Sequence, residues 1–383
     1  MQPCLTINGG FLSQKITGVQ RYGREIVVAL DRLLQDLPLR SILPARIVAP
    51  AGAEPRFPLS AISLELTAAK GGPFLPLWYQ LILPFAVRGV LLSLCNMGPL
   101  LARTHILCIH DLNVILARES YSRAFRIYYR TIQPLLAKRA ARVVTVSQFS
   151  AQMLAAKGIC PAQKISVIPN GHEHVARWRP NASPFAAEGA HRRPFIFVLG
   201  SRARHKNIAI LFAIAREIEA LGLDIVVAGS SATHFSDPGP GSVPPNVRMA
   251  GYVTDDDLAA LFQRALCFAF PSLAEGFGLP ALEAMALGCP VIASRAASLP
   301  EVCADAALYA DPRTPEDWLG QIKRLQSDPA LAPAMRAKGL HQAKRFSWAK
   351  SAELYLDLAV SLSGMPIAGS RRAAFPMQDG RNG

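Results

Sequence analysis

The sequence lacks several features that would assign the chain to a membrane-spanning or secreted class. No stretch of about 18 or more apolar residues occurs, so we expect no membrane-spanning helix. The N-terminal MQPCLTINGG has no basic region followed by an apolar core, so it differs from a secretory signal. The seven cysteines are scattered, odd in number and without a CxxC pair, which argues against a disulfide framework or a zinc site. These absences predict buried thiols in a reducing cytoplasm.

Acidic residues are scarce in the first half of the chain. Residues 1–180 contain 21 Lys and Arg against 8 Asp and Glu, whereas residues 181–383 contain 20 against 19. The net charge of +14 therefore comes almost entirely from the first half, which predicts an anionic partner there. Nucleic acid, an anionic membrane surface and a phosphorylated acceptor all have that charge. The length of 383 residues is sufficient for two domains.

The segment at residues 270–290, FPSLAEGFGLPALEAMALGCP, combines a strand, a glycine loop and a helix. An apolar run ends at Pro271, and residues 275–278 have the composition of a loop. From Pro280 onward apolar residues recur at helical spacing until Gly288. Glycines at a helix N-terminus leave free N–H groups and a close approach to the backbone, so this segment predicts an anion site.

Two acids, Glu275 and Glu283, bracket that loop with seven residues between them. Glu283 lies in an apolar, small-residue helix, where a carboxylate is costly unless it is paired or binds hydroxyls. An isolated E-x7-E spacing is typical of a capped helix with one satisfied core glutamate. The EGFGLP sequence between the acids and PVIAS after the helix make the combination specific.

The segment FPSLAEGFGLPALEAMALGCPVIAS, followed by SLPEV at residues 298–302, resembles the donor-binding segment of retaining glycosyltransferases of the GT4 type, which have the GT-B fold. The resemblance implies that Glu283 holds the ribose hydroxyls of a nucleotide-sugar and that Glu275, a catalytic-site residue, faces the transferred sugar. It also implies that backbone amides contact the sugar and the diphosphate at Gly276, Phe277, Gly278 and Leu279.

The same resemblance assigns further donor-binding residues in the second half. Lys206 follows the apolar strand at residues 195–199 and would bind the donor phosphates, together with Arg202 or Arg204. Tyr252 and Val253 would line the nucleobase pocket.

The acidic triplet at residues 255–257 precedes a helical pattern. We interpret it as first-turn chemistry of that helix rather than as a metal site, so we expect no metal or other cofactor.

Two loops of the first half carry site predictions. Gly18 stands at the start of a helix predicted at residues 19–34, and the resemblance implies that this loop closes over the donor phosphates. His110 and Asp111 follow a buried strand at residues 105–109, at the sheet edge where ligands bind in open α/β folds. The resemblance assigns His110 to the transferring sugar, while Asp111 orients the imidazole or stabilises the loop.

Residues 118–142 predict a basic amphipathic helix. Arg123, Arg126 and Arg130 recur on one face, and aromatic and aliphatic residues occupy the other. This pattern is typical either of a membrane-surface helix, which would also serve the acceptor side, or of a core helix with a solvated arginine face. Pro134 is expected to kink or interrupt it.

The alternation of strands and helices predicts an α/β protein of two Rossmann-like, doubly wound domains that face a central cleft, in agreement with the GT-B resemblance. The predicted divisions are an acceptor-binding domain at residues 1–180, a nucleotide-sugar-binding domain at 190–346, a helix at 347–363 that crosses back to the first domain, and a disordered tail at 364–383. Residues 50–76 are expected to be irregular. Residues 78–87 are apolar and aromatic, and they are expected to be helical and either to pack inside or to lie in a membrane interface.

The resemblance implies a retaining, metal-independent hexosyltransferase of surface or exopolysaccharide biosynthesis. GDP-mannose is the predicted donor, with a UDP-hexose as the alternative. The basic, aromatic first half predicts a lipid-linked oligosaccharide or similar glycan acceptor and a cytoplasmic protein held peripherally at the inner face of the membrane. A sugar-nucleotide epimerase and a non-catalytic nucleotide-sugar-binding protein are the alternatives of another class. Nucleic-acid binding is disfavoured, because the basic residues form no recognised module.

Overall fold

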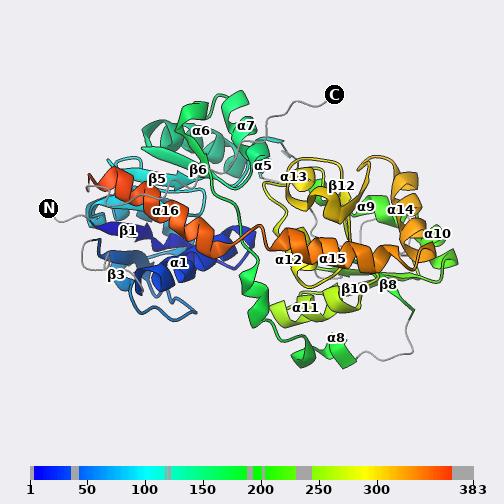
Figure 1. Cartoon of the computed structure of the whole chain (residues 1–383). Coiled ribbons are helices and arrows are strands. Elements are labelled where there is room, and N and C mark those ends of the chain that lie inside the picture. The colour runs from blue at the N-terminus through cyan, green and yellow to red at the C-terminus, as the bar shows by residue number, and fades with distance from the viewer. Residues whose placement is uncertain are drawn as a thin grey trace.

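The computed structural model describes residues 4–35, 43–116, 119, 122–187, 193–200, 203–229 and 244–364. Within these residues the chain forms two parallel sheets with flanking helices, and Figure 1 shows the two α/β units side by side. The doubly wound α/β class predicted from the sequence is therefore confirmed. Arg202 and, beyond Gly364, the tail predicted at the C-terminus lie outside the described residues.

The first sheet has the strand order β3-β2-β1-β4-β5-β6-β7, and every neighbouring pair is parallel. Its strands are β1 (Leu5–Asn8), β2 (Ala45–Ala51), β3 (Ser63–Lys70), β4 (Val90–Ser93), β5 (His105–Cys108), β6 (Arg142–Thr145) and β7 (Ile165–Val167). The chain order reverses between β1 and β4. In open sheets of this kind, ligands bind beyond the carboxyl ends of the strands at such a reversal.

The second sheet repeats the arrangement in the order β10-β9-β8-β11-β12-β13. Its strands are β8 (Phe195–Leu199), β9 (Asp224–Ala228), β10 (Val247–Gly251), β11 (Cys267–Phe270), β12 (Val291–Ser294) and β13 (Ala307–Ala310). Alternate residues of β8 enter different cores, with Phe197 on one face of the sheet and Val198 on the other. Burial on both faces explains why this strand is an uninterrupted apolar run.

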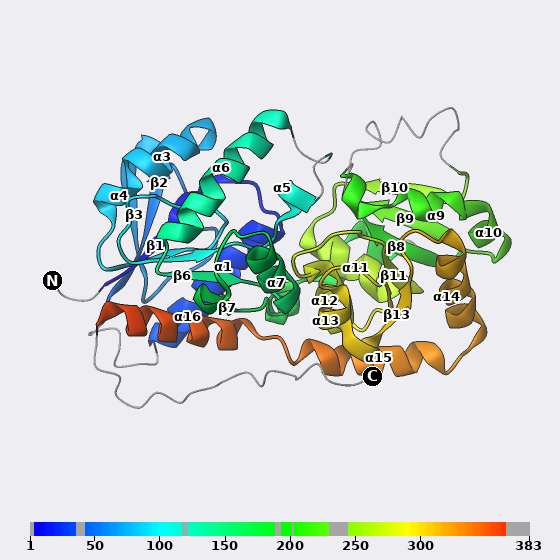
Figure 2. The same cartoon turned by 90° about the horizontal axis from the view of Figure 1, so that it is seen from above.

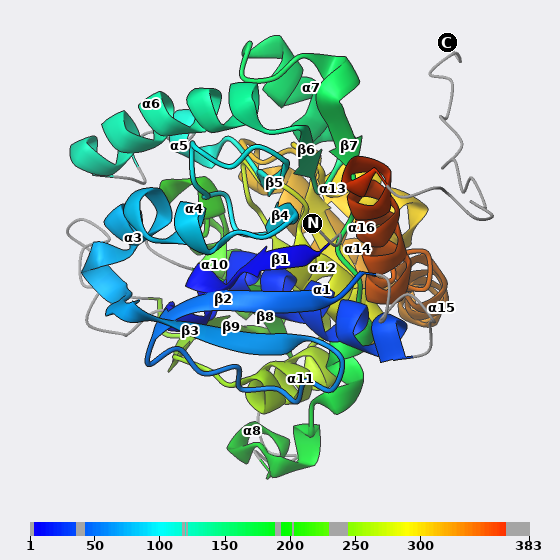
Figure 3. The same cartoon turned by 90° about the vertical axis from the view of Figure 1, so that its left-hand side faces the viewer.

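Helices cover the two sheets as Figures 2 and 3 show. In the first unit they are α1 (Gly18–Gln35), α3 (Leu75–Leu81), α4 (Leu83–Ala86), α5 (Asn113–Leu116), α6 (Arg123–Arg139) and α7 (Gln148–Ala156). From residue 184 onward they are α8 (Pro184–Ala187), α9 (Ala209–Ala213), α10 (Ala215–Ala220), α11 (Asp255–Arg264), α12 (Leu279–Ala286), α13 (Leu299–Cys303), α14 (Pro315–Ser327), α15 (Leu331–Ala343) and α16 (Trp348–Ser363). Pro134 lies inside α6 without ending it.

The last helix, α16, packs against α1 of the first unit (Figure 1). Tyr22 of α1 and Tyr355 of α16 are fully buried, and their hydroxyl oxygens lie 2.9 Å apart. The Tyr22 hydroxyl also donates to the carbonyl oxygen of Ile168 at 3.2 Å. This polar contact inside an apolar layer fixes where the end of the chain lies on the first unit.

The expectation of irregular structure over residues 50–76 is wrong, because β3 occupies residues 63–70. The strand lies at the edge of the sheet and pairs only with β2. Most of its side chains are exposed, so SLELTAAK lacks the apolar run that marks the interior strands. Among the described residues, no helix combines the length and apolar character needed to cross a bilayer.

Candidate functional site

The glycine loop between β11 and α12 adopts a conformation that requires glycine. Gly278 has φ of 96° and stands at the N-cap of α12, and a Cβ there would lie 2.5 Å from Cδ2 of Leu299. A Cβ at Gly276 would lie 2.5 Å from the carbonyl oxygen of His110 and 2.9 Å from Cβ of Asp111. Because His110 and Asp111 follow β5, the missing side chain at Gly276 lets the two units meet backbone to backbone.

Hydrogen bonds from the start of α7 hold that loop in place. The Ser147 hydroxyl donates to the carbonyl oxygen of Gly276 at 2.6 Å, and the Ser150 hydroxyl donates to the same oxygen at 3.1 Å. Glu301 of α13 accepts from the backbone N–H groups of Gln148 and Phe149 at 2.8 and 3.0 Å. A carboxylate from the second unit therefore caps a helix of the first, which favours this arrangement of the units.

Glu275 pairs with Lys206 at the carboxyl ends of β11 and β8. The Lys206 Nζ lies 2.6 Å from Glu275 Oε1 and 5.6 Å from the ring centroid of Phe270. Lys206 ends the short 3-10 helix η7 (Arg204–Lys206). The next residue, Asn207, has φ of 53° and donates to the carbonyl oxygens of Pro271 and Pro312, which ties this loop to two others. The hydrogen bonds of Asn207 thus hold the loop that carries Lys206 in place.

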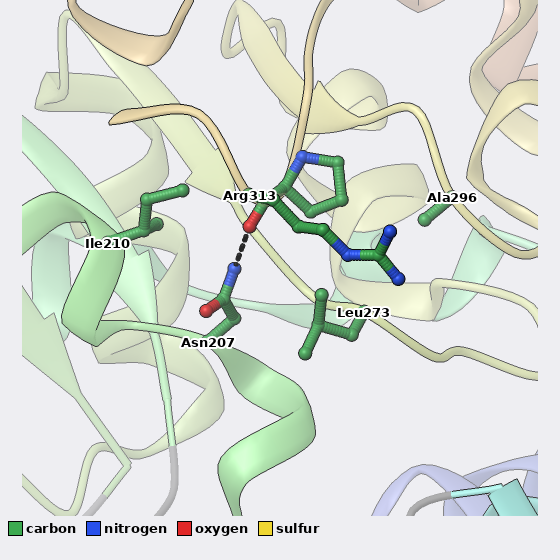
Figure 4. Close-up of a pocket in the computed structure, with 6 residues that line it drawn as sticks. Asn207, Ile210, Leu273, Ala296 and Arg313 are labelled. Carbon is green, nitrogen blue, oxygen red and sulfur yellow. Dashed lines mark hydrogen bonds between the residues drawn. The ribbon is translucent and has the colours of Figure 1, made fainter. Parts of the chain in front are cut away.

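A pocket of about 400 Å³ is lined by Asn207, which follows Lys206 directly in the chain, and by Ile210, Leu273, Ala296, Pro312 and Arg313. These residues follow β8, β11, β12 and β13, so the pocket lies at the carboxyl edge of the second sheet. Figure 4 shows the Arg313 guanidinium extending over the pocket. Below it, the side-chain amide of Asn207 donates a hydrogen bond to the carbonyl oxygen of Pro312. The position is the one at which open α/β sheets bind ligands.

His110 faces its own unit in this conformation. Its Nε2 donates to the carbonyl oxygen of Leu94 at 2.7 Å, and its ring meets the ring of Tyr22 edge-on at 4.6 Å between centroids. Burial lowers the pKa of His110 to about 4, so the imidazole is neutral near pH 7. Because a carbonyl only accepts, the proton sits on Nε2, and Nδ1 is left with an acceptor lone pair.

Asp111 stabilises its loop, and charges on the second unit affect its pKa. Its Oδ1 accepts from the backbone N–H of Asn113 at 2.8 Å, at the start of α5. Burial, reinforced by the negative charge of Glu275, raises the pKa of Asp111 to about 6, and Lys206 opposes that rise. Asp111, Glu275 and Lys206 therefore form one electrostatic group drawn from both units.

Glu283 is 3% exposed and is held by residues outside its own helix. Its Oε1 accepts from His174 Nε2 at 2.9 Å and lies 3.7 Å from Nε of Arg21. His174 is in the 3-10 helix η5 (Glu173–Arg177), and its Nδ1 accepts from the indole N–H of Trp348 at 3.0 Å. The indole thereby places the imidazole proton on Nε2, where it points at Glu283.

The acidic triplet is occupied by structural contacts. Asp255 forms a two-pronged ion pair with Arg21 of α1, and Asp256 accepts from the backbone N–H of Arg179 at 2.7 Å. Asp257 completes a capping box with Thr254 at the start of α11. The interpretation of these acids as first-turn chemistry is therefore confirmed.

The other predicted residues lie in different environments. Arg204 is exposed, and Gly18 begins α1 with open space around it. Tyr252 is 87% exposed, whereas the side chains of Val253, Phe277 and Leu279 are buried in the core. Phe277 meets Phe346 edge-on, so only its backbone can serve a ligand. On α6, Arg123 and Arg130 are exposed and Arg126 is partly buried.

The structure thus brings together His110, Asp111, Lys206, Glu275 and Gly276 at the boundary between the units. The arginines of α6 have no contact with this group among the described interactions.

Sequence reasoning missed Arg21, Ser147, Glu301 and the His174–Trp348 pair. The NGHEH sequence after β7 and the two serines at the start of α7 were visible, but nothing in them indicated which acid or carbonyl they meet.

Two family models match the chain. The model described as Glycosyl transferases group 1 matches residues 182–342, and the model described as Glycosyltransferase Family 4 matches residues 81–176. Together these matches cover more than half of the chain. The chain belongs to the GT4-type glycosyltransferases.

Its relatives include O-antigen chain mannosyltransferases. It is 47% identical to O-antigen chain mannosyltransferase B of Escherichia coli over 102 residues, which is 27% of each protein. It is 25% identical to O-antigen chain mannosyltransferase RfbU of Salmonella typhimurium over 255 residues, which is 65% of this chain and 68% of the relative. The most similar segment thus spans only about a quarter of the first relative.

Solved structures confirm the GT-B fold. Sucrose-phosphate synthase from Thermosynechococcus elongatus superposes with a TM-score of 0.69 at 19% identity, covering 94% of this chain and 99% of that one. At this identity the likeness concerns the fold alone.

We expect His174→Ala to raise the donor KM about tenfold with little change in kcat, because the lost Nε2–H leaves Glu283 without the bond that orients it. His174→Gln, which restores an N–H donor, should recover most of the affinity. The matched control is His172→Ala. His172 lies in the same segment as His174, but it contacts the carbonyl oxygen of Phe346 and not Glu283. Equal losses in His174→Ala and His172→Ala would contradict a specific role.

Two buried histidines should make stability pH-dependent. Burial lowers the pKa of His105 to about 3 and that of His110 to about 4, so the unfolded chain takes up these protons first and stability falls as the pH drops below about 6.5. Each should cost about 2 kcal/mol between about pH 7 and pH 5. Asp111 acts in the opposite sense, because its raised pKa favours the folded state as the pH falls through about 6.

The free energy of unfolding is measured by heat and by denaturant for the wild type and for His105→Gln at about pH 7 and about pH 5. The difference between the two proteins gives the contribution of His105 alone. The variant should lose less stability on acidification than the wild type does. Parallel pH dependence of the two proteins would show that His105 does not titrate in this way.

Proposed function

We propose that this protein transfers a hexosyl group from a nucleotide-sugar to a glycan acceptor with retention of configuration. The observation that carries the proposal is the Lys206–Glu275 pair, which stands beside the glycine loop at the N-terminus of α12 and opposite the His110–Asp111 loop. A cation and free helix N–H groups suit a diphosphate, and the adjacent carboxylate suits sugar hydroxyls.

The donor would lie mainly on the second unit. Glu283 holds the ribose diol, Tyr252 and the Val253 turn border the base, and Lys206 with Arg204 or Arg202 binds the diphosphate. Lys206 is neutralised by Glu275 in the present conformation, so the arriving phosphate would displace the carboxylate and free it for the sugar. Gly18 at the start of α1 would close over the phosphates from the first unit.

The chemistry divides between the leaving group and the acceptor. The bond from the anomeric carbon to the phosphate oxygen breaks with its electron pair, and the diphosphate leaves with added negative charge. Lys206, the arginine and the backbone N–H groups of the glycine loop stabilise that charge, which is the task a metal performs in other transferases. The acceptor hydroxyl attacks the same face and passes its proton to the leaving phosphate oxygen. His110 and Glu275 position the sugar ring.

The names of the relatives support mannose as the sugar and surface polysaccharide as the product. We therefore propose GDP-mannose as the donor and a lipid-linked oligosaccharide or similar glycan as the acceptor. A UDP-hexose is the alternative donor, because the base is selected by the shape of the pocket beside Tyr252.

We further propose that the protein works peripherally at the inner face of the cytoplasmic membrane. The exposed Arg123 and Arg130 on α6 and the basic first half of the chain support contact with anionic lipid.

The deciding experiment is slow donor hydrolysis across a panel of GDP- and UDP-sugars, with and without a chelator. Release of one nucleotide, unaffected by the chelator, would name the donor and support metal-independent transfer. A requirement for metal would return attention to Asp255–Asp257. Conversion of the nucleotide-sugar without release would indicate an epimerase, and an absence of both release and binding would refute the proposed function.

A further inference from the structure

The segment from Gly71 to Val87 contains no Asp, Glu, Lys or Arg, yet much of it faces solvent. It forms α3 and α4 with the short turn before them. Four large apolar side chains are exposed there, at Phe74 (61%), Leu77 (58%), Leu81 (59%) and Phe85 (85%). We call these four residues the apolar ridge. An exposed apolar cluster of this kind marks an interaction surface.

The ridge follows from the helical repeat of the segment. Its members are separated by three or four positions, so they occupy one face, while Leu75, Trp78 and Leu83 point into the core on the other. Both faces of α3 and α4 are therefore apolar. Folding explains only the buried face, because the core already has its contacts without the ridge.

Basic side chains flank the ridge in sequence and also occur on a neighbouring helix. Lys70 and Arg88 flank the uncharged segment in sequence, and both are exposed. The neighbouring helix α6 packs on the same core and brings Tyr129 close to Tyr79 of α3. Figures 2 and 3 both show α3, α4 and α6 on the same side of the first sheet.

The outer side of α6 continues the same chemistry. It carries the exposed Arg123 and Arg130 together with Ile127, which is 68% exposed. Exposed apolar and cationic side chains thus occur on elements at the same side of the first sheet.

We propose that the apolar ridge inserts into the headgroup–acyl boundary of an anionic bilayer, while the arginines of α6 contact the lipid headgroups. The inference rests on the proposed function and deepens it, since it assigns membrane attachment to residues in α3 and α4 as well as to the basic helix. Apolar insertion and headgroup attraction are additive in such interfacial binding.

Charge complementarity selects the bilayer over a second copy of this chain. Self-association through the ridge would bring the cations of two identical surfaces, Lys70, Arg88, Arg123 and Arg130, toward one another. An anionic lipid surface neutralises the same groups and also takes up the apolar side chains.

The two forces respond differently to salt, and this gives the test. Full-length protein is sedimented with vesicles of phosphatidylcholine, with or without phosphatidylserine, at low and high salt. Leu77→Gln/Phe85→Gln should lower binding about tenfold or more at high salt, where apolar insertion remains. Arg123→Gln/Arg130→Gln should lower low-salt binding to the phosphatidylserine vesicles by about tenfold. The matched control is Leu340→Gln, an exposed leucine on α15 of the second unit.

A second measurement uses a substitution that keeps the ridge apolar. Phe85→Trp should add fluorescence that brominated lipid quenches. The inference would be overturned if the ridge substitutions left vesicle binding at the wild-type level. It would also be overturned if brominated lipid did not quench the added tryptophan fluorescence. Size-exclusion data in which the ridge substitutions turn a dimer into a monomer would overturn it as well.

Donor hydrolysis without vesicles separates the two proposals. The ridge variant should retain it, since the ridge touches no donor residue. Vesicle binding through the ridge by a protein that neither binds nor hydrolyses a nucleotide-sugar would refute the proposed function and leave the inference standing.

Discussion

Lys206→Ala is expected to lower the rate of nucleotide release from the donor by about 100-fold to 1,000-fold. Lys206 Nζ stands 2.6 Å from Glu275 at the start of the glycine loop, where the proposed mechanism places the leaving diphosphate. Its removal withdraws the central cation of the site and leaves Glu275, a group that repels phosphate, without its partner. The substitution should therefore act on kcat more strongly than on donor KM.

The measurement is steady-state and single-turnover nucleotide release with the donor identified from the panel. Lys206→Arg keeps the charge in a different shape and should recover part of the rate. The control is Lys338→Ala, because Lys338 is an exposed lysine that pairs with Asp305 at 3.1 Å on the second unit. An unchanged rate in Lys206→Ala would remove the lysine from the mechanism.

Glu283→Gln is expected to weaken binding of the free nucleoside diphosphate by about 100-fold, because in the proposed site the ribose diol would lose its charge-assisted hydrogen bonds to the carboxylate. The glutamine oxygen can still accept from His174 Nε2, so the buried contacts of this 3%-exposed position are largely kept. The substitution thus tests the charge rather than the fold.

Calorimetric titration with the nucleotide and its 2′-deoxy analogue makes the test specific. Wild type should discriminate strongly between the two ligands, and Glu283→Gln should bind them nearly alike. Glu25→Gln is the matched control, since Glu25 is an equally buried carboxylate that pairs with Arg177 at 2.5 Å. Undiminished discrimination in Glu283→Gln would mean that Glu283 serves only the core.

The interior strands and the glycine loop could be predicted because their signals are local. Strands buried on both faces must be apolar along their whole length, as in β8 and β11. Glycine is the residue that takes a positive φ without steric strain, as at Gly278. The edge strand β3 was missed for the converse reason, since a strand with one neighbour and exposed side chains has no apolar run.

The partners of the site residues could not be predicted, because they come from distant parts of the chain. The E-x7-E spacing identified both acids, yet Glu275 meets Lys206 only when the second sheet is folded, and Glu283 meets His174 only when the segment after β7 packs against α12. His110 was placed correctly at the end of β5. That its Nε2 is engaged by Leu94 follows from the packing of the first unit.

The sequence by itself therefore determined the class of the fold, the glycine loop and the identity of the two acids, since each depends on short-range periodicity or backbone freedom. Only the tertiary structure decided that Gly276 rests on His110, that Trp348 orients His174 toward Glu283, and that the uncharged segment around Leu77 remains on the surface. The physical reason is that hydrogen bonds, ion pairs and burial depend on distance in space, which pattern along a chain does not specify.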